Sequence, residues 1–157
     1  MILLSAVAVS AVAAIAASAQ LPDDDVSARA VTFRGQPVTG DQIALGQEVY
    51  AQNCASCHGA NLEGQPDWKR RLQNGRMPAP PHDESGHTWH HSDQDLFDMT
   101  KLGVGGVVES YESDMPAFGE ILSDEDIAAV LAFIKSTWPE RQRDVQARIT
   151  AKDGDGS

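Results

Sequence analysis

Cys54-Ala55-Ser56-Cys57-His58 is the stretch that decides what this chain can fold around, since it holds both cysteines and one of the five histidines. Two thiols three residues apart on one helical turn can reach the two vinyl groups on one edge of a porphyrin. The imidazole of His58 then lies beneath the iron and can bind it. The pattern predicts one covalently attached haem c, held by Cys54 and Cys57, with His58 as an axial ligand.

Three other uses of a cysteine pair agree less well with the sequence. A thioredoxin-like redox pair needs a preceding strand, whereas residues 41–53 have the apolar spacing of a helix. A structural zinc site needs four ligands, usually two cysteine pairs or one cysteine pair and one histidine pair, and the chain has a single cysteine pair. A disulfide across two intervening residues would close a strained ring. Haem attachment is therefore the favoured interpretation.

The first nineteen residues carry no charged side chain and end in Ala17-Ser18-Ala19, followed by an acidic run. This predicts a cleaved signal peptide over residues 1–19 and export to the periplasm, which haem attachment also requires. The alternative is a retained membrane anchor formed by residues 2–19. Residues 20–37 are expected to be a lead-in or tether, residues 38–138 the haem domain, and residues 139–157 a charged helix with a disordered tail.

The formal net charge is −11. This charge argues against nucleic acid or an anionic membrane surface as a partner. It favours redox partners that carry a basic docking face, although an acidic surface also serves to keep an exported protein soluble. Contact with a membrane is expected only if the N-terminal segment is retained.

Outside the motif, the chain has helical signals and no convincing strand, which predicts an all-α fold. The expected helices are a first one over 41–53, a short one opened by Pro66-Asp67-Trp68, one from Ser92 to Gly103, one from Ser123 to 138, and a charged one from 139 to about 150. The final residues, 153–157, are expected to be disordered.

The order of these parts resembles that of the class I c-type cytochromes. An N-terminal helix leads into the motif, and Met115-Pro116-Ala117-Phe118 precedes a capped final helix. The resemblance implies a cytochrome c fold, a small helical domain wrapped around one haem, in which the N- and C-terminal helices cross. A small residue in the first helix and an aromatic one in the last then meet, with Gly46 or Tyr50 facing Phe133.

In that family the sixth iron ligand is a methionine just before the final helix, which corresponds to Met115. A thioether favours ferrous iron, so a His/Met pair also suits an electron carrier of raised potential. Met77 is the rival, because it too precedes a proline, but it follows His58 by only a short segment. Met99 lies within an expected helix, where a methionine usually fills the core.

Residues close to the haem are predicted less sharply. The family's axial histidine donates its second N–H to a proline carbonyl, and Pro66 is the approximate match. Trp68, Arg71 and Arg76 are candidate donors to the haem propionates. The alternative for Lys69-Arg70-Arg71 is a solvated helix face.

The segment that leads to the Ser92 helix contains four histidines. The simplest interpretation is a solvated insertion, with a copper or zinc site, haem ligation and a docking loop as the alternatives. The histidines are His82, His87, His90 and His91.

The sequence therefore predicts a periplasmic monohaem electron carrier that turns over no substrate of its own. An enzyme or gas sensor with an open sixth position is one alternative, and a copper-handling protein built on residues 82–91 is another. A third is an electron-transfer subunit of a larger dehydrogenase or oxidase.

Overall fold

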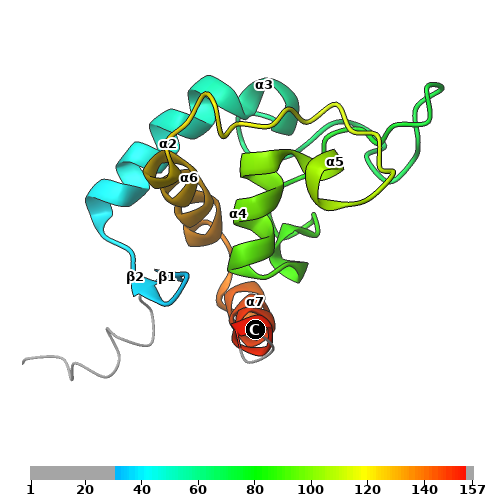
Figure 1. Cartoon of the computed structure of the whole chain (residues 1–157). Coiled ribbons are helices and arrows are strands. Elements are labelled where there is room, and N and C mark those ends of the chain that lie inside the picture. The colour runs from blue at the N-terminus through cyan, green and yellow to red at the C-terminus, as the bar shows by residue number, and fades with distance from the viewer. Residues whose placement is uncertain (1–30, 155–157) are drawn as a thin grey trace, which may run out of the picture.

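The computed structural model describes residues 31–154, and this part of the chain is mostly helical, as predicted (Figure 1). The predicted signal peptide and residues 20–30 of the lead-in lie outside the described residues. Between residues 31 and 154, no helix has both the length and the apolar character needed to cross a membrane. The elements are β1 (Thr32–Phe33), β2 (Gln36–Pro37), α2 (Gly40–Asn53), α3 (Ala55–His58), the 3-10 helix η1 (Thr88–His90), α4 (Asp93–Leu102), α5 (Val104–Val107), α6 (Asp124–Ser136) and α7 (Glu140–Gly154).

Residues 31–37 form a small antiparallel hairpin where the sequence predicted a tether. Thr32 pairs with Pro37 and Phe33 with Gln36. Gly35 adopts a positive φ of 76°, as a tight two-residue hairpin turn requires. Phe33 is 6% exposed and packs into the core. Strands of two residues are too short to show an alternation of apolar and polar side chains, and for this reason they were not predicted from the sequence.

Capping boxes begin three of the predicted helices. The side chains of Thr39, Ser92 and Ser123 each accept a hydrogen bond from the backbone three residues on, at the starts of α2, α4 and α6. The predicted starts are therefore confirmed. The predicted short helix after Pro66 is wrong, because Asp67 has a φ of 54° and no α-helix accommodates that angle.

The first and last helices of the predicted haem domain, α2 and α6, cross in close contact at Gly46 (Figure 1). A Cβ atom at Gly46 would lie 2.0 Å from the Ala129 carbonyl oxygen and 2.8 Å from Phe133 Cβ. One turn later, the rings of Tyr50 and Phe133 lie 5.6 Å apart. The crossing predicted from Gly46, Tyr50 and Phe133 is thus confirmed. It packs the buried face of α6 against α2.

Replacing Gly46 by Ala should force α2 and α6 apart. We expect the free energy of unfolding to fall by about 1–3 kcal/mol relative to a Gly40→Ala control, the usual cost of inserting a methyl group into a packed interface. Gly40 lies in the same helix with nothing within 4 Å of its would-be Cβ. Guanidinium chloride unfolding of both variants measures the difference, and equal stabilities would show that the crossing tolerates a side chain.

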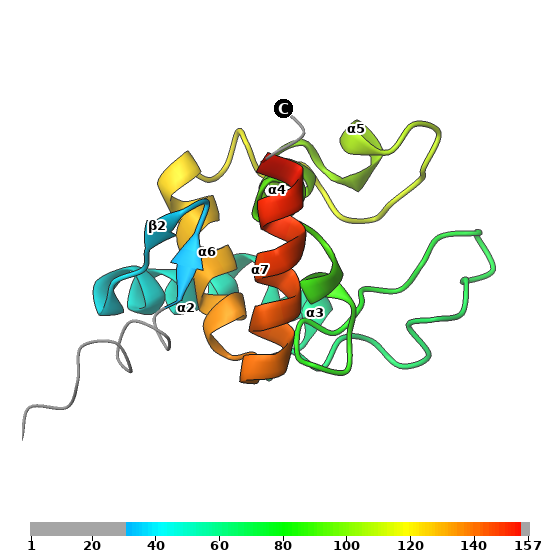
Figure 2. The ribbon, with the colours of Figure 1, turned by 90° about the horizontal axis from the view of Figure 1, so that it is seen from below.

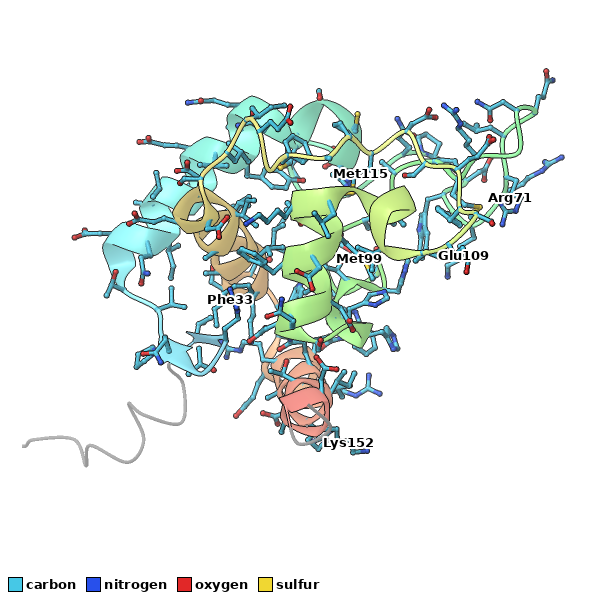
Figure 3. The ribbon with its side chains drawn as sticks, viewed as in Figure 1. Phe33, Arg71, Met99, Glu109, Met115 and Lys152 are labelled. Carbon is cyan, nitrogen blue, oxygen red and sulfur yellow. The ribbon has the colours of Figure 1, made fainter. Side chains whose placement is uncertain are left out.

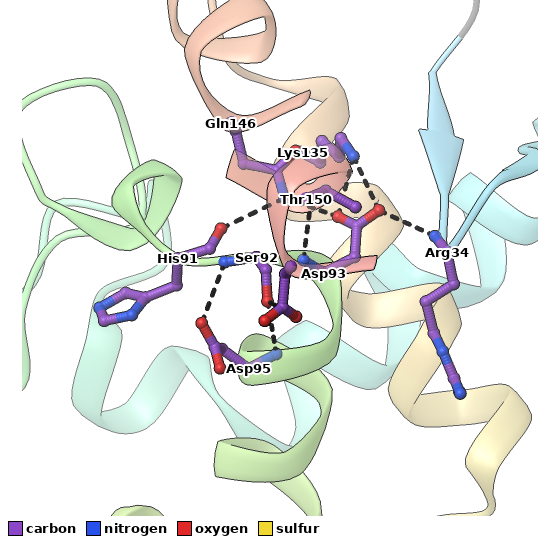
Figure 4. Close-up of polar contacts among 9 residues, drawn as sticks. Arg34, His91, Ser92, Asp93, Asp95, Lys135, Gln146 and Thr150 are labelled. Carbon is purple, nitrogen blue, oxygen red and sulfur yellow. Dashed lines mark hydrogen bonds and ion pairs between the residues drawn. The ribbon is translucent and has the colours of Figure 1, made fainter. Parts of the chain in front are cut away.

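The buried carboxylate of Asp93 connects several elements of the fold (Figure 4). Asp93, only 2% exposed, lies 2.9 Å from Lys135 Nζ through Oδ1. The same oxygen accepts a hydrogen bond from Gln146 Nε2 at 2.6 Å, and Oδ2 accepts one from the Arg34 backbone N–H at 2.8 Å. A buried charge is tolerated when it is paired and hydrogen-bonded in this way. Asp93 therefore joins the hairpin, α4, α6 and α7.

Helix α7 packs across the start of α4 (Figure 2). Thr150 Oγ1 accepts the backbone N–H of Asp93 at 3.0 Å, and Asp153 accepts the hydroxyl of Ser92 at 2.8 Å. A charged helix was predicted to end near Thr150 and to give way to a disordered tail from 153. The helix instead continues to Gly154, because its last turn is bonded to α4; residues 155–157 lie outside the described part.

Candidate haem site

The two thiols lie where α2 passes into α3. Cys54 is both the C-cap of α2 and the N-cap of α3, and its N–H donates to the Tyr50 carbonyl at 2.9 Å. Both thiols are free, Cys54 half-buried and Cys57 exposed. Burial, and secondarily Cys57, raises the pKa of Cys54 to about 11, so that thiol is protonated near neutral pH. Cys54 is the N-cap of α3, and Cys57 and His58 lie within its single turn, so the three side chains are close together.

His58 is the buried member of the motif, 8% exposed. Its Nδ1 lies 2.9 Å from the Pro80 carbonyl oxygen. Because a carbonyl only accepts, Nδ1 carries the ring proton and Nε2 keeps its lone pair. Burial lowers the pKa of His58, the hydrogen bond to Pro80 opposing it, and so favours the neutral ring. His58 is therefore in the tautomer that binds a metal through Nε2.

The carbonyl that orients His58 belongs to Pro80, so the prediction of Pro66 is wrong. The chain folds back on itself after the motif, with Leu62 and Gly64 at positive φ. The Gln65 N–H donates to the Ala79 carbonyl at 2.9 Å, which closes residues 66–78 into an excursion away from His58. The chain therefore returns to His58 at Pro80.

Met115 lies on the long segment between α5 and α6, and Met99 on α4 (Figure 3). Hydrogen bonds from the Phe118 and Gly119 N–H groups to the carbonyls of Thr100 and Lys101 hold this segment against the end of α4. Met115 itself is partly buried, and its N–H donates to Ser113 Oγ at 3.1 Å. The segment is thus fixed a few residues beyond Met115. Its role as second ligand stays a prediction.

The donor set fits a covalently bound haem c. Two free thiols and a neutral imidazole with an available nitrogen are brought together on one helical turn. The family model described as cytochrome c matches residues 43–138, more than half of the chain. The chain belongs to the cytochrome c family. Haem c is accordingly its cofactor, and electron transfer is the chemistry of its relatives.

The chain covers most of one curated relative and smaller parts of the others. Cytochrome c6 of Picosynechococcus is 32% identical over 101 residues, which cover 64% of this chain and 77% of the relative. The cbb3-type cytochrome c oxidase subunit CcoP of Rhodobacter capsulatus is 29% identical over 113 residues, 72% of this chain and 35% of the relative. The gluconate 2-dehydrogenase cytochrome c subunit of Pantoea cypripedii is 28% identical over 123 residues, 73% of this chain and 24% of the relative.

The chain spans only about a third of the length of the CcoP proteins that it matches. The comparison with solved structures finds no significant match.

Of the three residues predicted to bind the haem propionates, two already have acceptors in the protein. Arg71 Nη1 donates to the Gly75 carbonyl at 2.6 Å. Arg76 pairs with Asp114, immediately before Met115, and so ties the 66–78 excursion to the Met115 segment. Trp68 stacks on His87 with ring centroids 5.6 Å apart. Their binding to the propionates stays a prediction.

Trp89 has a buried polar atom that no sequence motif pointed to. Its indole Nε1 has no hydrogen-bond partner within residues 31–154. A buried N–H is normally satisfied, so an acceptor from outside the protein, such as an ordered water or a haem carboxylate, would be needed to pair this one. Only the tertiary structure distinguishes this tryptophan from a packing residue.

The predicted solvated insertion over residues 82–91 is wrong for His82. Its ring stacks on that of His58, with centroids 3.9 Å apart and planes 20° apart. Burial, and then the neighbouring His58 and His87, lowers the pKa of His82 well below its usual range. The rings of His87 and His91 lie 5.5 Å apart. Over residues 31–154, no group of three or more potential ligands is arranged to hold a metal ion.

Tyr50 supports the motif from α2. Its hydroxyl donates to the Gly59 carbonyl at 2.8 Å, just beyond His58. Burial raises the pKa of Tyr50 well above its ordinary value of 10.0, with smaller contributions from Cys54, Glu63 and Asp83. The phenol therefore stays protonated in the folded protein at a pH where it ionises in the unfolded chain.

Tyr50 should make the stability fall at alkaline pH. Because its pKa is higher in the folded state, its contribution is complete below pH 10.0 and is lost as the unfolded chain ionises above that value. We expect the difference in unfolding free energy between the wild type and Tyr50→Phe to shrink by about 1.4 kcal/mol per pH unit above that point. Denaturant unfolding between pH 7 and 11.5 measures it, and a difference independent of pH would contradict the assignment.

Proposed function

We propose that this cytochrome c is a periplasmic monohaem carrier of single electrons. The bound haem supplies reversible one-electron chemistry at its iron. The observation that carries the proposal is the state of His58, a neutral buried ring with Nε2 available beside two free thiols. Cys54 and Cys57 hold the porphyrin, and His58 binds the iron. The uncharged leader of residues 1–19 supports export.

Met115 completes the proposed ligand set on the other face of the haem. A second protein ligand keeps small molecules off the iron, which suits a carrier rather than an enzyme or gas sensor. Pro116 restricts the backbone beside Met115, and the hydrogen bonds of Phe118 and Gly119 to α4 anchor the segment. A ligand held on an anchored segment stays in place while the iron changes charge.

Met115→Ala should abolish methionine ligation. We expect the wild-type ferric protein to show the weak methionine-to-iron charge-transfer band near the red end of the visible spectrum, and the variant to lack it. The reduced variant should also bind carbon monoxide, which the wild type excludes. Met77→Ala is the matched control, since Met77 likewise precedes a proline. Loss of the band in the Met77 variant and its retention in the Met115 variant would reverse the assignment.

The surface charge supports transient partners with a basic docking face. The net charge is −11, and the Met115 segment carries exposed carboxylates at Glu109, Glu112, Asp114 and Glu120. Opposite charges accelerate the encounter of weakly bound redox partners, and salt screens this attraction.

Electron transfer to small reagents should show this steering. We expect the second-order rate with the cation hexaammineruthenium(III) to fall as ionic strength rises, because screening removes the attraction. The rate with the anion ferricyanide should rise instead. Stopped-flow measurements between about 10 and about 500 mM salt cover the range over which the Debye screening length becomes short. Identical salt dependence for both reagents would show that the acidic surface has no part in steering.

A second candidate function is that of a cytochrome subunit in a larger oxidoreductase complex. The relatives named as an oxidase subunit and a dehydrogenase subunit favour it, because this chain matches only part of their length. Co-purification of the exported protein with such a complex would support this role over that of a free carrier.

A further inference from the structure

His82 is held rigidly against the proximal face of the haem motif. Its ring lies face to face with that of His58 at 3.9 Å. Thr88 Oγ1 lies 2.8 Å from its Nδ1, and its carbonyl accepts a hydrogen bond from Trp138 Nε1 at 2.7 Å. Its own N–H donates to the Leu62 carbonyl at 2.8 Å. Contacts from three separate segments therefore fix the backbone and the ring of this residue.

This stacking excludes His82 as the ligand opposite His58. Two ligands on opposite faces of an iron point their donor atoms at each other through the metal. The rings of His58 and His82 are instead stacked face to face with their centroids 3.9 Å apart, which leaves no space between them for a metal ion. His82 can act on the iron only through His58.

The axial ring needs two constraints, and the segment from Pro80 to His82 supplies both. The hydrogen bond to the Pro80 carbonyl fixes where Nδ1 lies, but a single bond leaves the ring free to turn about it. A flat neighbour against the ring face removes that freedom. We propose that His82 is a positioning residue that fixes the plane of His58 and thereby sets the electronic environment of the haem iron. This inference rests on the proposed ligation by His58.

A histidine meets this need better than an apolar residue. A leucine would fill the space without presenting a flat face, and a phenylalanine would stack without an edge atom for Thr88 to bind. The imidazole would also add a dipole next to the ring of His58. Polar groups around a haem favour the more highly charged ferric state, and hence a lower reduction potential.

Four variants test the proposal in the holoprotein. His82→Leu removes the stack, His82→Phe keeps a ring, and Thr88→Val frees the edge of His82. His90→Leu is the control, since His90 belongs to the same segment but stacks on Trp89. The readouts are the reduction potential and the low-spin ferric signal in electron paramagnetic resonance, which responds to the orientation of the axial ring.

We expect His82→Leu to raise the potential and to shift the ferric signal. His82→Phe should raise the potential and keep the position of the signal, because the flat neighbour persists, but broaden it, because the bond to Thr88 is lost. Thr88→Val should broaden the signal, and His90→Leu should match the wild type in both readouts. A ferric signal and a potential that both stay unchanged in His82→Leu would overturn the proposal. If the leucine variant does not mature, an unchanged potential in His82→Phe together with an unbroadened signal in Thr88→Val would overturn it. A wild type that shows no low-spin ferric signal would instead overturn the proposed ligation by His58.

Discussion

The hydrogen bond between His58 Nδ1 and the Pro80 carbonyl, 2.9 Å long, is the contact on which the site depends. It selects the tautomer whose Nε2 can bind iron, and it requires residue 80 to return to the motif after the 66–78 excursion. That return is built from backbone geometry. Gly64 lies so close to Pro81 that a Cβ atom would be 2.4 Å from the Pro81 nitrogen. The glycine therefore helps to position His58 indirectly, by letting two stretches of chain meet.

The two long helices of the domain converge on this same segment. Helix α2 delivers the motif through Cys54 and contributes the hydroxyl of Tyr50 to the Gly59 carbonyl. Helix α6 ends beside Trp138, whose indole N–H donates to the carbonyl of His82. Because α2 and α6 are locked together at Gly46, the thiols and the orienting segment are held from opposite sides by one packed pair. The fixed position of His58 is thus a property of the helix crossing.

Local signals in the sequence predicted what local chemistry determines. The motif, the capping serines and Gly46 as a point of close approach all follow from neighbouring residues or from a helical period. Pro80 and His82 could not be found in this way, because their roles arise when a turn-rich segment folds back onto His58. The positive φ angles of Leu62 and Asp67 also escaped prediction. Leucine rarely adopts that conformation, and aspartate adopts it more readily but is still found mostly at negative φ. Their cost is borne by the tertiary contacts around them.

Among the described residues outside the family match, residues 31–42 and 139–154 pack against the helices within it. The family model covers residues 43–138, yet Asp93 binds the backbone of Arg34 before this range and Gln146 after it. Gln146 is fully buried and Lys135 is 5% exposed, so removing α7 would open a charged pair to water. The same helix α4 also anchors the Met115 segment through the carbonyls of Thr100 and Lys101. The Asp93 network therefore steadies, through α4, the element that carries the proposed second ligand, just as the Gly46 crossing steadies the first.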